Sequence, residues 1–326
     1  MQEKLNSVEK FAILNAEPEN YCSQAKSILS EVGTAHYEEM SRQDLLARIE
    51  DYEVLITRLG NTIDREVIDR GRRLRFIVTA TTGLDHIDVA YAEEKGIQVL
   101  SLKGQTEFLR TVRATAELTV GLALSLIRHI HHAHPSVLGG VWDRDLFRGN
   151  ELYGKTAGII GMGRLGSIVA GYFKAFGMRV IGYDPHGTSD HLDEKVASLD
   201  HLLAESDLVS VHVSYDETTR GLLNGPRLSK MKTGSYLINT SRGGIIDESA
   251  LLDELVSGRI AGAALDVLCG EPHIDSRHPL VAHAKENPNV LIVPHIGGNT
   301  YESFIKTEVF MAKLLKQSVE QERGGI

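Results

Sequence analysis

The sequence predicts an α/β protein built from two doubly wound parallel-sheet domains, one inserted into the other. Short apolar runs rich in β-branched residues alternate with helical patterns along the whole chain. Most of these runs are unbroken, which is typical of parallel strands covered by helices on both faces. At 326 residues the chain is long enough for two domains, each with its own hydrophobic core.

Ten apolar runs are predicted to form the strands of these sheets. Helical patterns stand between most neighbouring runs, which is the strand–helix–strand succession of doubly wound folds. In chain order the runs are Phe11–Leu14, Val54–Thr57, Phe76–Thr79, Val99–Leu100, Thr156–Ile160, Val180–Tyr183, Leu208–Val213, Tyr236–Asn239, Ala263–Val267 and Val290–Val293.

Two long helical patterns mark the predicted domain boundary. One runs from about Val112 to His132, and the other runs from Thr300 to about Gln321. A long helix on each side of the intervening region indicates that one domain is inserted into the other. We expect the outer domain to comprise residues 1–108 and 299–326, and the inserted domain to comprise residues 109–298.

The composition argues against several classes of partner. The net charge of −9 and the pI near 5.9 disfavour nucleic acid and anionic membranes. Cys22 and Cys269 are the only cysteines, which implies neither a disulfide framework nor a cysteine metal site. No apolar run approaches the roughly 18–20 residues of a membrane helix, and Met1–Lys10 lacks the apolar core of a signal peptide. We therefore expect a cytoplasmic protein with no membrane or nucleic-acid partner.

A glycine-rich loop in the inserted domain predicts a dinucleotide site. The loop Gly161-Met162-Gly163-Arg164-Leu165-Gly166 directly follows the predicted strand Thr156–Ile160. The helix after it carries one continuous apolar face, formed by Leu165, Ile168, Val169, Tyr172, Phe173 and Phe176. A second strand then ends on Asp184, which stands 18 positions after Gly166.

Each part of this pattern has a physical purpose in binding NAD. Gly161 permits a tight turn, Gly163 lets a pyrophosphate approach the backbone, and Gly166 lets helix and strand pack closely. The helix N-terminus offers N–H groups and the positive end of its dipole to the phosphates. The Asp184 carboxylate would accept hydrogen bonds from the ribose hydroxyls and repel a 2′-phosphate, so NAD is favoured over NADP. The alternative, a glycine-rich turn without a ligand, does not account for the acidic residue in register.

Three further segments carry candidate catalytic residues just beyond predicted strands, where ligands bind in open α/β sheets. Arg242 lies in Asn239-Thr240-Ser241-Arg242-Gly243-Gly244, and its guanidinium suits a planar carboxylate and would polarise a substrate carbonyl. His295 in Pro294-His295-Ile296 can act as acid or base, oriented by Glu271 in Gly270-Glu271-Pro272. Taken singly, Arg242 suits a surface ion pair, Gly270-Glu271-Pro272 suits a turn, and His295 suits a structural histidine. Their joint occurrence downstream of a dinucleotide loop favours hydride-transfer chemistry.

These segments resemble the D-isomer-specific 2-hydroxyacid dehydrogenases, most nearly the branch containing D-3-phosphoglycerate dehydrogenase. The resemblance runs from about Thr79 to Gly298 and includes the Gly161–Gly166 loop with Asp184. The other matching segments are Gly83-Leu84-Asp85-His86-Ile87-Asp88, Ala114-Thr115-Ala116-Glu117, Met231-Lys232 through Gly243, Leu265-Asp266-Val267, Glu271-Pro272 and Pro294-His295.

The resemblance implies an NAD-dependent oxidoreductase that interconverts a D-2-hydroxy acid and its 2-oxo acid. The implied substrates are either the pair D-3-phosphoglycerate and 3-phosphohydroxypyruvate, or the 2-oxo acids hydroxypyruvate and glyoxylate. It also implies a Rossmann NAD domain inserted into a flavodoxin-like substrate domain, and a homodimer formed through the NAD domains. The implied catalytic residues are Arg242, Glu271 and His295. The implied cofactor-binding residues are Gly161, Gly163, Arg164, Leu165, Gly166, Asp184, Val213, Ser214, Thr219, Thr240, Ser241, Arg242, Asp266, His295 and Gly298.

The implied substrate-binding residues are Thr82 and Gly83, through their backbone amides, together with Arg242 and Arg58. Arg58 stands where phosphoglycerate dehydrogenases place a phosphate-contacting arginine, but it suits a plain surface residue equally well. Ser214 stands where many members carry proline, and the segment Ser101–Val112 is longer than the usual connection. These departures leave the identity of the substrate open.

Three alternatives concern metal binding and function. The histidines His129, His131, His132 and His134 suit a helix C-terminus better than a metal site, because no carboxylate or cysteine cluster accompanies them, so no metal is expected. An NAD(H)-sensing binding protein of the corepressor type keeps the same Arg/Glu/His set on the same fold. A formate dehydrogenase is disfavoured, because those enzymes carry glutamine in place of Glu271.

Overall fold

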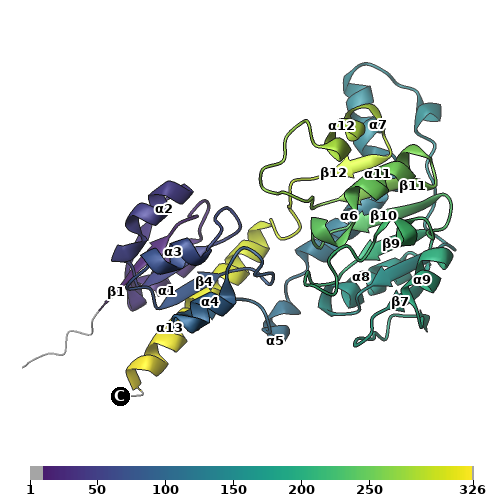
Figure 1. Cartoon of the computed structure of the whole chain (residues 1–326). Helices are drawn as coiled ribbons and strands as arrows, with labels where there is room; N and C mark the ends of the chain where they lie inside the picture. Colours follow the sequence, from purple (N-terminus) through teal and green to yellow (C-terminus); the bar gives the residue numbers. More distant parts are fainter. Residues whose placement is uncertain (1–9, 325–326) are drawn as a thin grey trace, which may run out of the picture. The chain divides into compact units, whose positions relative to one another are not determined.

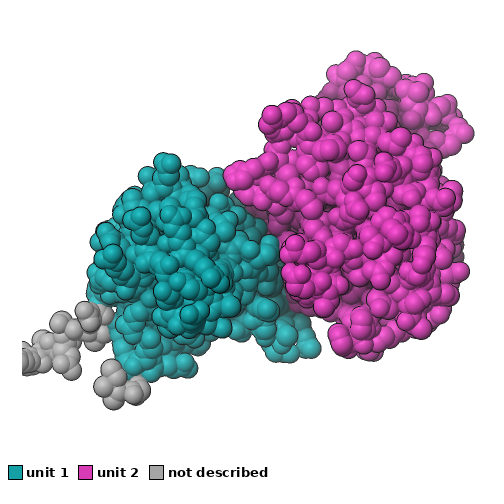
Figure 2. Space-filling view, viewed as in Figure 1, with its two compact units in different colours: residues 1–112, 300–326 teal, residues 113–299 magenta. Residues whose placement is uncertain are grey.

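The computed structural model describes residues 10–324 of the chain. The chain divides into two compact units, shown in Figure 2: unit 1 comprises Met1–Val112 and Thr300–Ile326, and unit 2 comprises Arg113–Asn299. The predicted boundaries, after residues 108 and 298, lie within four residues of these. Within residues 10–324, no helix has the length and apolar character needed to cross a membrane.

Unit 1, in which Figure 1 labels β1 and β4, is built on a five-stranded parallel sheet with the strand order β2-β1-β3-β4-β5. This is a flavodoxin-like order, as the family resemblance implies, and the order reverses between β1 and β3. The strands are β1 Phe11–Asn15, β2 Gly33–Tyr37, β3 Val54–Thr57, β4 Phe76–Thr79 and β5 Gln98–Leu100. The helices are α1 Ser23–Val32, α2 Arg42–Arg48, the short η1 Ile49–Asp51, α3 Arg65–Arg70, α4 Val89–Glu94, α5 Thr106–Leu109 and α13 Tyr301–Gly324.

Helices cover both faces of this sheet. Ile13 of β1 packs toward α1 and α13, where Leu315 belongs to the same buried cluster. The next residue, Leu14, packs on the opposite face with residues of α2 and α3 such as Leu45 and Val67. This alternation places successive strand residues in two separate cores, which is why the strands read as unbroken apolar runs.

Strand β2 was missed by the sequence analysis. It reads Gly33-Thr-Ala-His-Tyr37, and its side chains alternate between exposed and part-buried because it lies at the edge of the sheet. An edge strand buries little apolar surface, so it lacks the apolar run by which the other strands of the sheet are recognised.

Unit 2 is built on a seven-stranded parallel sheet with the order β12-β11-β10-β9-β6-β7-β8. This is a Rossmann order, as the sequence predicts, and the strand order reverses between β6 and β9. The strands are β6 Thr156–Ile160, β7 Arg179–Tyr183, β8 Glu194–Lys195, β9 Leu208–Val211, β10 Ser235–Asn239, β11 Ile260–Leu265 and β12 Val290–Ile292. The helices are α6 Ala114–Ile127, α7 Ile130–Leu138, η2 Arg144–Phe147, α8 Arg164–Ala175, α9 Leu199–Glu205, α10 Gly225–Leu228, η3 Gly243–Ile245, α11 Glu248–Val256 and α12 Pro279–Glu286.

The prediction of one helix from Val112 to His132 is wrong. Helix α6 ends at Ile127, and α7 begins at Ile130 after His129, which adopts the left-handed conformation with φ of 55°. The Ile127 carbonyl accepts a hydrogen bond from the Asn150 N–H at 3.2 Å, so it is satisfied from outside the helix. The left-handed residue His129 breaks the helix, the Asn150 contact satisfies a carbonyl at its end, and the apolar periodicity indicates neither.

Candidate active site

The predicted site residues of unit 2 lie just beyond the carboxyl ends of its parallel strands. Because these ends share one edge of the sheet, residues from distant parts of the sequence gather there. The glycine loop follows β6, Asp184 follows β7, Val213 and Ser214 follow β9, Thr240 to Arg242 follow β10, Asp266 and Glu271 follow β11, and His295 follows β12.

The glycine loop has the backbone that a dinucleotide pyrophosphate requires. Gly161 has φ of +90°, and a Cβ there would lie 2.4 Å from the His212 carbonyl oxygen. A Cβ on Gly166 would lie 1.9 Å from the Gly161 carbonyl oxygen, so the close approach of loop and helix excludes any side chain. A Cβ on Gly163 would instead meet nothing within 4 Å, and no side chain caps the start of α8. This loop therefore fits a pyrophosphate beside the N-terminus of α8.

Asp184 is held in place by the loop that it follows. Its carboxylate accepts hydrogen bonds from the backbone N–H groups of Met162 at 2.7 Å, and of His186 and Gly187 at 2.8 Å each. Burial raises the pKa of Asp184, but these three donors outweigh that effect and hold the pKa below its usual value. The residue is therefore a negatively charged acceptor at neutral pH.

The turn after β10 fixes the backbone of Arg242. The Asn239 side chain accepts from the Ser241 N–H at 3.0 Å and donates to the Arg242 carbonyl at 3.0 Å. The Thr240 hydroxyl lies 2.9 Å from that of Thr119 on α6. The half-buried Arg242 side chain donates from Nη1 to the Ser241 carbonyl at 2.9 Å, so it leaves this turn in a defined direction.

His295 and Glu271 form a hydrogen-bonded pair. The His295 Nδ1 atom lies 2.9 Å from Glu271 Oε2, and the two side chains are 25% and 28% exposed. Because a carboxylate only accepts hydrogen bonds, it selects the tautomer with hydrogen on Nδ1 and leaves Nε2 for exchange with a substrate. This arrangement suits an acid/base catalyst.

The backbone at His295 is held in the left-handed region, with φ of 53°, by Asp266. The His295 N–H donates to the Asp266 carbonyl at 2.8 Å. The Asp266 carboxylate accepts from the N–H groups of Ile296 at 2.6 Å and Gly297 at 2.9 Å. Burial raises the pKa of this carboxyl group to about 6. Asp266 thus anchors the histidine loop, and its predicted contact with a nicotinamide stays a prediction.

The loop that carries Glu271 is anchored by Glu248, a residue that the sequence analysis missed. Glu248 Oε1 accepts from the Cys269 N–H at 2.7 Å, and Glu248 Oε2 lies 3.2 Å from His278 Nε2. Both ends of the segment 269–278 are therefore tied to α11. These partners are 21 and 30 residues from Glu248 in the chain, so no local sequence pattern indicates them.

The remaining predicted cofactor-binding residues lie around the same edge. The Thr219 hydroxyl donates to the Ser214 carbonyl at 2.6 Å and accepts from the Asp216 N–H at 2.9 Å, which closes the loop after β9. The Ser241 hydroxyl donates to the Val211 carbonyl at 2.8 Å. Leu165 and Arg164 open α8, and Gly298 is exposed in the loop after β12.

The predicted substrate-binding residues Thr82, Gly83 and Arg58 belong to unit 1. Thr82 and Gly83 follow β4, where the Thr81 hydroxyl donates to the Gly83 carbonyl at 2.8 Å. Arg58 follows β3, and its guanidinium forms an ion pair with Glu308 of α13. Arg58 is therefore not a plain surface residue.

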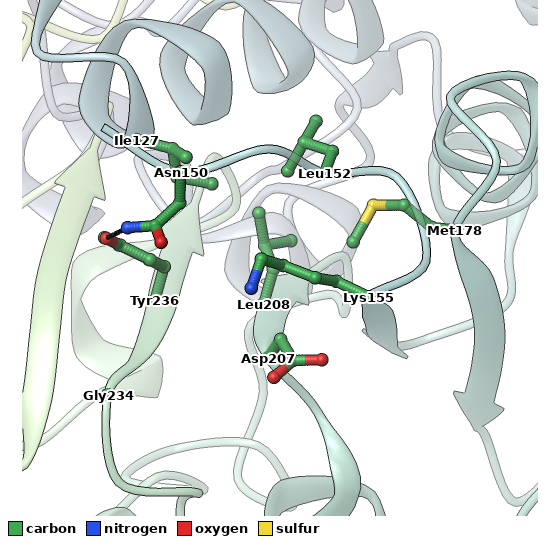
Figure 3. Close-up of a pocket in the computed structure, with 9 residues that line it drawn as sticks. All are labelled: Ile127, Asn150, Leu152, Lys155, Met178, Asp207, Leu208, Gly234 and Tyr236. Carbon is green, nitrogen blue, oxygen red and sulfur yellow. Dashed lines mark hydrogen bonds between the residues drawn. The ribbon is translucent and has the colours of Figure 1, made fainter. Parts of the chain in front are cut away.

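A small pocket of about 50 Å³ in unit 2 lies outside this candidate site (Figure 3). Its lining residues Lys155, Asp207 and Gly234 immediately precede β6, β9 and β10. The pocket is therefore at the amino ends of the strands, whereas the candidate site is at their carboxyl ends. Across residues 10–324, no three His, Cys, Asp or Glu side chains are grouped as metal ligands.

Comparison with known proteins gives concordant matches. The family model described as "D-isomer specific 2-hydroxyacid dehydrogenase, NAD binding domain" matches residues 120–297. A hydroxypyruvate reductase of Thermotoga maritima is 40% identical over 267 residues, 82% of this chain and 84% of the relative. A D-3-phosphoglycerate dehydrogenase of Methanocaldococcus jannaschii is 37% identical over 303 residues, 91% of this chain and 56% of the relative. The chain thus spans about half the length of the phosphoglycerate dehydrogenases that it matches.

Solved structures show the same likeness over nearly the whole chain. The TT0316 protein from Thermus thermophilus has a TM-score of 0.80 at 34% identity, covering 92% of this chain and 94% of that one. A D-lactate dehydrogenase from Aquifex aeolicus, complexed with NAD and lactic acid, has a TM-score of 0.83 at 28% identity, covering 97% of each chain.

Proposed function

Because this chain belongs to the D-isomer-specific 2-hydroxyacid dehydrogenase family, we propose that it interconverts a small D-2-hydroxy acid and the corresponding 2-oxo acid. Membership makes it an NAD-dependent oxidoreductase, as the sequence predicts. The hydrogen-bonded pair of His295 and Glu271 is the observation that carries the proposed chemistry. Hydroxypyruvate, glyoxylate and 3-phosphohydroxypyruvate are the candidate 2-oxo acids.

The residues of this chain bind the substrate carboxylate, polarise the carbonyl group and transfer the proton. When bound, NADH supplies the hydride that the carbonyl carbon of the 2-oxo acid receives. The Arg242 guanidinium binds the substrate carboxylate and polarises the carbonyl oxygen. His295 Nε2 donates a proton to that oxygen as the alcohol forms, and Glu271 stabilises the imidazolium ring that precedes this transfer. In the oxidative direction the neutral ring takes the hydroxyl proton.

The test of this function is NADH oxidation with a panel of 2-oxo acids: 3-phosphohydroxypyruvate, hydroxypyruvate, glyoxylate, pyruvate and 2-oxoglutarate. We expect at least one of them to be reduced to the D-2-hydroxy acid. If NADH binds tightly but none is reduced, the proposed function is wrong, and a binding protein of the corepressor type becomes the better explanation.

Replacing Asp184 with alanine should relax the preference for NADH over NADPH by about 10-fold, the change that ~1.4 kcal/mol produces. The carboxylate that repels a 2′-phosphate is then absent. The kcat/KM values with the two cofactors measure this preference. Asp190→Ala removes an exposed carboxylate from the same loop and is the control. An unchanged preference in Asp184→Ala would remove this residue from the ribose site.

We also propose that the protein is a cytoplasmic homodimer formed through unit 2. The supporting feature is a group of exposed apolar side chains within the segment 138–146, from the end of α7 into η2, where Leu138 is 75% exposed, Trp142 is 88% exposed and Leu146 is 63% exposed. Large side chains exposed together are typical of a protein interface. Sedimentation should give twice the 35.8 kDa chain mass. Trp142→Glu should shift the protein toward monomer, and a monomeric native protein at micromolar concentration would contradict the proposal.

A further inference from the structure

The carboxyl end of β3 in unit 1 is already filled by carboxylates of the chain itself. In the order β2-β1-β3-β4-β5, the strand order reverses between β1 and β3, and open α/β sheets bind ligands at such a switch point. Glu17 follows β1 and Arg58 follows β3. The predicted substrate-binding segment Thr82–Gly83 follows β4, the next strand along the same edge.

Glu17 occupies the hydrogen-bond donors of the turn after β3. Its Oε1 accepts from the Thr57 hydroxyl at 2.7 Å and from the Arg58 N–H at 3.0 Å, and its Oε2 accepts from the Gly60 N–H at 2.9 Å. Two convergent backbone N–H groups with a hydroxyl form the kind of concavity that cradles an external anion. Here the anion is internal, so a phosphate would have to displace it.

The Arg58 side chain is also occupied by groups of the chain itself. Its guanidinium pairs with Glu308, whose side chain is only 1% exposed, and Nη1 donates to the Glu19 carbonyl at 3.0 Å. The guanidinium carbon also lies 4.7 Å from the centre of the Phe304 ring. The second carboxylate oxygen of Glu308 accepts from the Cys22 N–H at 2.7 Å, which fixes the acid in position.

The charge balance at this switch point is unfavourable for a phosphate. Glu17 and Glu308 carry two negative charges against the single positive charge of Arg58. A phosphate approaching Arg58 would meet a net negative charge and would have to break an ion pair whose carboxylate is buried, which leaves Glu308 uncompensated. An uncharged substituent meets neither obstacle.

We propose that Glu17 and Glu308 are specificity-determining residues that restrict the substrate to 2-oxo acids with an uncharged group on C3, such as hydroxypyruvate. They do so by excluding phosphorylated analogues such as 3-phosphohydroxypyruvate. This inference rests on the proposed function and selects among its candidate substrates. The specificity comes from repulsion, because the negative charges of the two carboxylates disfavour binding of the phosphorylated compound.

The first experiment compares kcat/KM of the native protein for hydroxypyruvate and 3-phosphohydroxypyruvate with NADH. We expect a preference of about 100-fold or more for hydroxypyruvate, since the phosphate would leave buried charges unpaired. Equal or better reduction of the phosphorylated compound would overturn this inference and leave the proposed function standing. Reduction of neither compound, nor of any other 2-oxo acid, would overturn both.

The second experiment uses Glu17→Gln and Glu308→Gln. Each is expected to raise the ratio of kcat/KM for the phosphorylated over the unphosphorylated substrate by roughly 10-fold, mainly through KM. A purely structural role would lower both activities together and leave the ratio unchanged. Because Glu308 is buried, Glu17→Gln is the variant of lower folding risk. Glu19→Gln, which removes an exposed carboxylate from the same loop, should not alter the ratio. An unaltered ratio in Glu17→Gln would overturn the proposal.

Discussion

Replacement of His295 by alanine is expected to lower kcat by about 10²–10⁴ while leaving the affinity for NADH nearly unchanged. The lost group is the imidazole that donates the proton at Nε2. The loop itself should persist, because its anchors are the carbonyl and carboxylate of Asp266 bonded to backbone N–H groups, which alanine retains. Steady-state kinetics with hydroxypyruvate give kcat, and fluorescence titration gives the NADH dissociation constant.

His201→Ala is the control for this variant, because His201 is an exposed histidine of unit 2 on α9 and is none of the predicted site residues. It should keep the native kcat. If His295→Ala instead lost NADH affinity as strongly as turnover, the residue would be a cofactor ligand and not the acid/base catalyst.

The second large effect is expected from Arg242→Gln, which should lower kcat/KM for the 2-oxo acid by about 10²–10³. Glutamine keeps a polar side chain but removes the positive charge that binds the carboxylate and polarises the carbonyl. The turn should survive, because Asn239 holds it through the backbone of residues 241 and 242.

Arg242→Lys separates charge from geometry at the same position. Lysine restores the charge but not the planar fork, so its kcat/KM should lie between those of the glutamine variant and the native protein. Arg220→Gln, at a guanidinium that is 62% exposed, is the control and should retain native kinetics. Native kinetics in both Arg242 variants would exclude the residue from the substrate site.

Most of the fold could be predicted because a strand that is buried on both faces appears in the sequence as an unbroken apolar run. β6 was predicted with its observed bounds, Thr156–Ile160, and Ile159 and Ile160 pack in the two cores on either side of the sheet. The strands that were missed, β2 and the two-residue β8, lie at sheet edges and bury little. The break at His129 was missed because the left-handed conformation of this residue interrupts a pattern whose apolar spacing continues across it.

The pairing of His295 with Glu271 was expected from chemistry and strand-end position, and their observed separation is 2.9 Å. The residues that hold the site could not be found in this way. Glu248 ties down the Glu271 loop, and Glu17 reaches a turn 41 residues away. Such contacts depend on how elements meet in space, and a carboxylate in a loop has no sequence signal for its partner.

The discontinuity of unit 1 sets the order in which the two units can be completed during synthesis. Helix α13 supplies Met311, Leu315 and Val319 to the core that covers β1, β3 and β4, and it supplies Glu308 to Arg58. All strands of the NAD-binding unit have been synthesised by residue 292, before α13 exists. During synthesis, unit 2 can therefore complete its core while one face of the unit 1 sheet still lacks the cover of α13, so the unit that contains the earliest part of the chain is the last to be completed.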